Sequence, residues 1–66
     1  MFPKVGDTTG AEVTVAEKTY ALVELDCGYT AVLPGRGYIE GETLQVKIVS
    51  IEPSHRSQPS IQVEAA

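Results

Sequence analysis

The sequence has little cysteine and no long apolar run. A single cysteine, Cys27, among 66 residues excludes an internal disulfide framework and a zinc site built from several cysteines. No apolar run approaches the roughly 18 residues that a membrane helix needs. Residues 1–4 lack an apolar segment, so we expect no signal peptide. One free thiol in a short chain without such a segment fits a reducing compartment, and we expect a cytoplasmic protein.

Positive charge is also scarce. Five lysines and arginines stand against nine aspartates and glutamates, which gives a formal net charge of -4. This balance argues against any partner held by bulk electrostatic attraction, because non-specific nucleic-acid binding depends on the neutralisation of phosphates. A nucleic-acid site on this chain would therefore need its few cations to lie in one place.

What the chain does contain is a series of short runs of Val, Ile, Thr and Tyr, separated by glycines and prolines. Apolar and polar residues alternate within these runs, and no run keeps a helical period for three turns. The pattern predicts one domain, 1–66, with five strands at residues 11–17, 20–25, 29–33, 44–51 and 60–64. A turn at residues 26–28 should join the second and third strands, with Gly28 at a positive φ.

The alternation also predicts which side chains face inward. In the first strand Val13 and Val15 should face one way, and Glu12 and Thr14 the other. In the second strand Tyr20 and Leu22 should point outward. The outward side of the fourth strand turns apolar at Val49, which predicts a bulge there.

Five short strands and almost no helix are too little for two packed sheets. Closing one sheet on itself buries the inward faces and removes the open edges at the same time. We therefore expect an all-β fold, a small five-stranded Greek-key β-barrel, with the OB-fold and the SH3-like barrel as the two candidates. The gap of about ten residues before the fourth strand favours the OB-fold, because that fold has a variable helix or loop at this point.

Several short motifs follow one another in a fixed order. They are Val5-Gly6-Asp7, the second strand Tyr20-Ala21-Leu22-Val23-Glu24-Leu25, Gly41-Glu42 and Ile51-Glu52-Pro53. In this order they resemble the S-one domain, the RNA-binding OB-fold repeated in the largest protein of the bacterial small ribosomal subunit. Val32-Leu33-Pro34-Gly35 followed by Gly41-Glu42 is similar to the TRAM domain of tRNA-modifying enzymes. Both resemblances imply an OB-fold that binds RNA.

The S-one resemblance also implies where RNA would bind, on the second and third strands. The positions that usually carry stacking aromatic residues are occupied here by Thr19, Leu22 and Pro34. The contact with bases must then be made without aromatic residues at these positions, and we expect Tyr20, Leu22 and Tyr29 to make it.

The cations that could meet phosphates lie in the predicted loops. Lys18 follows the first strand, Arg36 follows the third, and His55 and Arg56 follow the fourth. The first and last of these loops flank the binding groove of an OB-fold, so we expect the cations to converge and to contact phosphates. The candidate nucleic-acid-binding residues are Lys18, Tyr20, Leu22, Tyr29, Arg36, His55 and Arg56.

No spacing in the sequence singles out an acid–base pair, an activated nucleophile, a metal site or a phosphate-binding loop. We expect no enzyme activity, no metal and no cofactor, but a small protein that binds single-stranded RNA as an accessory or chaperone in translation or RNA processing. The alternative is a protein-interaction module. One form is a decoy resembling the alpha subunit of initiation factor two, to which Lys18-Thr19-Tyr20-Ala21-Leu22 is weakly similar. An open strand edge would also allow dimerisation.

Overall fold

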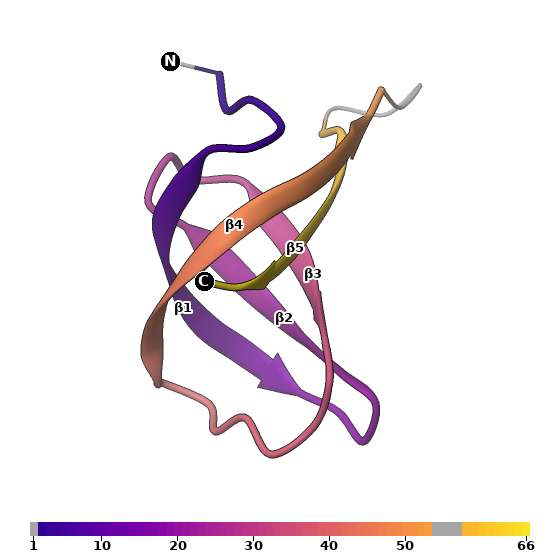
Figure 1. The fold of residues 1–66 in the computed structure, drawn as a ribbon. Helices are drawn as coiled ribbons and strands as arrows, with labels where there is room; N and C mark the ends of the chain where they lie inside the picture. Colours follow the sequence, from indigo (N-terminus) through magenta and orange to yellow (C-terminus); the bar gives the residue numbers. More distant parts are fainter. Residues whose placement is uncertain (1, 54–57) are drawn as a thin grey trace.

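Five strands wrap into a closed barrel (Figure 1). The computed structural model describes residues 2–53 and 58–66. The strands are β1 (Thr8–Ala16), β2 (Tyr20–Leu25), β3 (Thr30–Pro34), β4 (Thr43–Glu52) and β5 (Ser60–Ala65). Within the described residues, no helix is long and apolar enough to cross a membrane.

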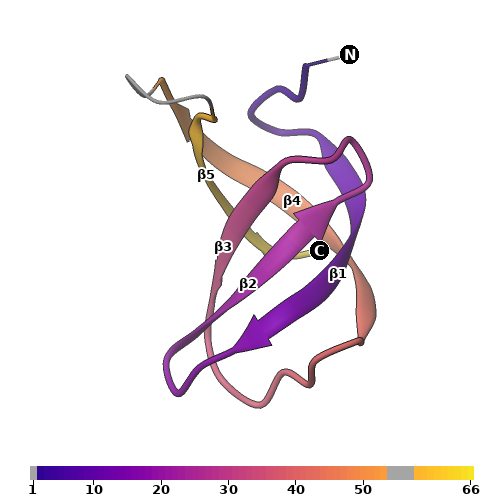
Figure 2. The same ribbon diagram turned by 180° about the vertical axis from the view of Figure 1, so that it is seen from behind.

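The strand order around the barrel is β1-β2-β3-β5-β4. Strands β1, β2 and β3 form an antiparallel meander, and β4 returns to pair with β1, which is the Greek-key arrangement. Strand β5 closes the barrel between β4 and β3 and runs parallel to β3 (Figure 2). The prediction of a small five-stranded Greek-key β-barrel of the OB-fold class is confirmed.

The core of the barrel is made by alternate residues of all five strands, and every buried residue in it is apolar. Removing a Val, Leu or Ile side chain from water contributes roughly 1.5–3 kcal/mol, so this inner layer is the main source of stability. Its members are Ala11, Val13, Ala21, Val23, Leu25, Ala31, Leu33, Val46, Ile48, Ile61 and Val63. The period of two that was visible in the sequence is therefore the period of burial.

A bulge in β1 changes the direction of one side chain from the predicted one. The register between β1 and β2 shifts between Val13 and Val15, so Thr14 is the extra residue. The Thr14 hydroxyl donates a hydrogen bond to the Leu22 carbonyl oxygen at 3.1 Å. Val15 then lies opposite Leu22, on the outer face of the barrel, and is only half-buried. The prediction that Val15 faces the same way as Val13 is wrong, because the bulge reverses the alternation at this point.

The bulge predicted in the fourth strand is present. The register between β4 and β5 shifts between Ile48 and Ser50, and the Val49 side chain remains 47% exposed. The predicted turn is also confirmed, with Gly28 at a φ of 97°. Strand β1 begins earlier than expected, at Thr8, because its first residues pair with β4.

Candidate nucleic-acid interface

The outer face of the β2–β3 hairpin carries three rows of cross-strand partners. They are Tyr20 with Pro34, Leu22 with Val32, and Glu24 with Thr30. Residues directly opposite each other in an antiparallel pair point to the same face of the sheet. The hairpin therefore presents an aromatic and proline row, an aliphatic row and a polar row in succession.

The aliphatic row continues onto β1. Val15 lies opposite Leu22, and Leu22 lies opposite Val32, so three half-buried aliphatic side chains cross three strands outside the barrel. Tyr20, in the neighbouring row, is 39% exposed. We call Val15, Tyr20, Leu22, Val32 and Pro34 the outer strip. A solvent-facing sheet surface normally alternates to polar residues, so this strip offers apolar contact to a ligand.

Two loops meet beside the outer strip. The Gly35 N–H donates a hydrogen bond to the Thr19 carbonyl oxygen at 2.9 Å, which ties the β3–β4 loop to the β1–β2 loop. Lys18 and Arg36 each neighbour one of these two residues in the chain, and both are exposed. Figure 1 shows both loops at the same end of the barrel, and we call Lys18 and Arg36 the basic end.

The β3–β4 loop is fixed by short contacts along its length. The Ile39 N–H donates to Glu42 Oε1 at 3.0 Å, and the Gly41 N–H donates to the Val13 carbonyl oxygen at 2.8 Å. Tyr38 packs half-buried over Gly35, whose φ is 121°. A Cβ at Gly35 would lie 3.3 Å from a ring carbon of Tyr38. These contacts anchor the loop that carries Arg36.

Carboxylates lie close in the chain to both cations of the basic end. Glu17 precedes Lys18 and Glu40 follows Arg36 within the same two loops, and both are exposed. With Glu42 in the same loop the carboxylates outnumber the two cations, so Lys18 and Arg36 can act on a phosphate only at short range.

Some predicted site residues do not join this group. Tyr29 lies at the other end of the hairpin, half-buried, with its ring edge-on to Phe2 at a centroid distance of 5.4 Å. His55 and Arg56 lie outside the described residues. The last residue of β4, Glu52, and the first of β5, Ser60, are partners at the end of the barrel opposite the β1–β2 loop (Figures 1 and 2). Of the predicted residues, the structure brings together Lys18, Tyr20, Leu22 and Arg36.

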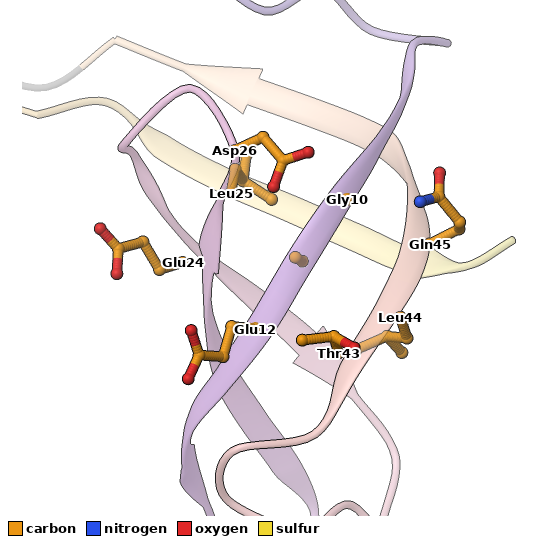
Figure 3. A pocket seen from close by; sticks show the side chains of 9 residues that line it. Gly10, Glu12, Glu24, Leu25, Asp26, Thr43, Leu44 and Gln45 are labelled. Atoms are coloured by element: carbon orange, nitrogen blue, oxygen red, sulfur yellow. The ribbon is translucent and has the colours of Figure 1, made fainter.

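A groove lies beyond the polar row, across β1 from the hairpin to β4 (Figure 3). Glu12 of β1 lies opposite Glu24 of β2, and both carboxylates are exposed. Asp26 lies over Gly10, where a Cβ would come within 2.6 Å of Asp26 Oδ2. Thr43, Leu44 and Gln45 line the other side. Within residues 2–53 and 58–66, no group of three or more His, Cys, Asp or Glu side chains could hold a metal ion.

Three members of the outer strip, Val15, Val32 and Pro34, were absent from the predicted site. The position of Val32 follows from the hairpin itself, because partners in β2 and β3 are symmetric about Cys27. The position of Val15 depends on the β1 bulge, for which the sequence carries no clear signal.

The strand order and the outer strip define the class of the protein as a small OB-fold barrel with a partly apolar outer face on β1, β2 and β3. No protein-family model matches the chain, and no curated protein matches its sequence. The resemblance to S-one and TRAM domains therefore stays a prediction from the motifs.

Proposed function

We propose that this protein binds single-stranded RNA at the outer strip and the basic end, without catalysing a reaction. Its role would be that of a cytoplasmic accessory or chaperone in translation or RNA processing, as the motifs shared with S-one and TRAM domains imply. The observation that supports RNA binding is the hydrogen bond from Gly35 to Thr19, which joins the loops of both described basic-end cations beside the exposed Tyr20 ring.

The chemistry of the outer strip fits unpaired bases. A base stacked on an aromatic ring contributes roughly 1–3 kcal/mol, and any base can do so because every base has a π-face. Tyr20 offers such a ring, and Leu22 and Val32 continue the apolar surface beside it. Bases within a duplex cannot reach such a face, so the ligand is a single strand with little sequence preference.

The basic end fits the backbone of the same strand. Lys18 and Arg36 are exposed next to the aromatic row, where they can contact phosphates while bases rest on the strip. With only two such cations the electrostatic share of binding is small. We expect the logarithm of the affinity to fall with the logarithm of salt with a slope of about −1.4, at about −0.7 per phosphate contact.

The test is fluorescence anisotropy with a labelled octauridylate at several salt concentrations. A Lys18→Gln/Arg36→Gln double variant should bind more weakly and lose most of the salt dependence. The matched control is Lys4→Gln/Lys47→Gln, which removes the same charge from two other exposed positions and should keep the wild-type slope. No binding at low salt, or equal effects of the two double variants, would contradict the proposal.

A protein-interaction module is the second candidate function. It is favoured by the position of the aliphatic row Val15–Leu22–Val32 directly beside the carboxylates of Glu12 and Glu24, which would suit a partner with apolar and basic side chains. The same titration separates the two functions, because a protein-binding face would give no octauridylate binding even at low salt.

A further inference from the structure

The outer face of the β2–β3 hairpin changes character over a short distance. Tyr20 and Pro34 stand next to the basic end, Leu22 and Val32 follow, and Glu24 comes next. A strand rises about 3.3 Å per residue, so the Tyr20 and Glu24 positions are about 13 Å apart. Only two apolar rows lie between the cations at one end and a carboxylate at the other.

The carboxylate of Glu24 does not stand alone. Glu12 is its direct partner on β1, and Figure 3 shows the two side chains extending from neighbouring strands. Asp26, further along the hairpin, adds a third negative charge above Gly10. Like charges placed directly opposite each other destabilise a sheet, so the Glu12–Glu24 pair does not stabilise the fold.

These carboxylates act on any strand of RNA that continues past Leu22. The Glu24 position is about 7 Å beyond the Leu22 position along the strand. The Debye length at physiological ionic strength is about 8 Å, so a phosphate past the aliphatic row would feel both charges with little screening. Beyond the Leu22–Val32 row, therefore, an RNA strand finds no further apolar surface, and its phosphates are repelled rather than attracted.

We propose that the RNA site takes a short single-stranded segment of about two to three nucleotides, and that Glu12 and Glu24 set its boundary. This inference rests on the proposed function. One base lies on the Tyr20–Pro34 row and the next on the Leu22–Val32 row, with the phosphates turned toward Lys18 and Arg36. The Glu12–Glu24 pair repels the next phosphate and ends the contact.

The test is a length series of labelled oligouridylates, from the dinucleotide to the octamer, measured by anisotropy at low salt. A longer oligomer can place its nucleotides on the site in several positions along its length, which we call its registers. For the wild type, the association constant divided by the number of these registers should rise up to the trimer and then level off. Glu24→Lys should extend the site, because the phosphate that the Glu24 carboxylate repels in the wild type would be contacted by a positive charge in the variant. Its salt slope with the hexamer should steepen by about 0.7, while the slope with the trimer stays the same.

Two further variants control this measurement. Glu52→Lys makes the same change of charge on β4, a strand that pairs with neither β2 nor β3, and should alter trimer and hexamer binding by the same factor. Glu24→Lys should fold, because it converts a like-charge pair with Glu12 into an opposite-charge pair. If circular dichroism shows that it does not, Glu24→Gln removes the carboxylate and should still raise hexamer affinity relative to trimer affinity.

The outcomes separate the two proposals. A wild-type affinity per register that keeps rising from the trimer to the octamer overturns the short site and leaves RNA binding intact. Equal effects of Glu24→Lys and Glu52→Lys on hexamer binding also overturn it, because net charge would then explain both. Failure of the wild type to bind even the octamer overturns the proposed function itself.

Discussion

The two faces of the β2–β3 hairpin are both apolar over much of their length, but for different reasons. The inner face consists of residues no more than 2% exposed: Ala21, Val23, Leu25, Ala31 and Leu33. On the outer face, Tyr20 is 39% exposed, and Leu22 and Val32 are half-buried. The inner side chains have partners within the barrel, whereas the outer ones are partly in contact with water.

This difference in exposure separates the apolar side chains that the fold requires, on the inner face, from those that it does not require, on the outer face. The inner face is sufficient to hold the hairpin in the barrel, so the outer face is free to be polar, as it is at Glu24 and Thr30. Leu22 and Val32 are partly exposed, so each buries a smaller share of its apolar surface than its neighbours on the inner face. We interpret them as residues kept for a ligand, and the predictions below are ways to test this distinction.

The largest expected effect is the loss of stability caused by a substitution on the inner face. Leu33→Ala removes a side chain with no exposed surface and should lower the free energy of unfolding by about 2–5 kcal/mol. Val32→Ala, the adjacent residue on the outer face, should lower it by less than about 1 kcal/mol, because its side chain is already partly hydrated. Urea denaturation measures both values. Equal losses would show that the outer face also supports the fold.

The second effect concerns binding and belongs to the outer face. Tyr20→Ala should lower octauridylate affinity roughly 5- to 150-fold, which corresponds to a loss of about 1–3 kcal/mol of stacking. Tyr20→Phe keeps the ring and should retain most of the affinity. Anisotropy measures both, beside a urea curve that checks the fold. An unchanged affinity of Tyr20→Ala would remove this residue from the site.

The smallest effect comes from the polar end of the outer face. Glu12→Gln relieves the like-charge pair with Glu24 and should raise the free energy of unfolding by about 0.2–1 kcal/mol at low salt. The gain should shrink at high salt, because both carboxylates are exposed and screened. Glu52→Gln, whose partner is Ser60, serves as the control and should change little. Equal gains from both variants would contradict a specific pair repulsion.

Most of the inner face could be predicted from the sequence, because burial follows the alternation of residues along each strand. The bulge in β4 could also be predicted, since an apolar residue, Val49, interrupts a polar series. The bulge in β1 could not, because its extra residue, Thr14, continues the regular alternation of polar and apolar residues that Glu12 and Val13 begin. The prediction that Val15 shares a face with Val13 failed for this reason.

The site could be predicted only where it depends on local structure. The turn centred on Cys27 fixes the register of the hairpin, and so the pairing of Tyr20 with Pro34 beside the two basic loops. The same register carries Tyr29 to the opposite end, where it packs against Phe2. The pairing of Thr8 with Lys47 joins distant parts of the chain, and nothing in the local pattern indicates it.

The seam between β3 and β5 is narrow: a single register pair, Val32 with Gln62, joins them, whereas five pairs join β2 to β3. Transient opening of the barrel should begin where the fewest ladder bonds must break, which is along this seam. Val32 belongs both to the seam and to the outer strip. A ligand on the outer strip would contact β3 at Val32 and stabilise the closed barrel relative to the opened one, so the backbone amides of β5 should exchange with deuterium more slowly when the strip is occupied.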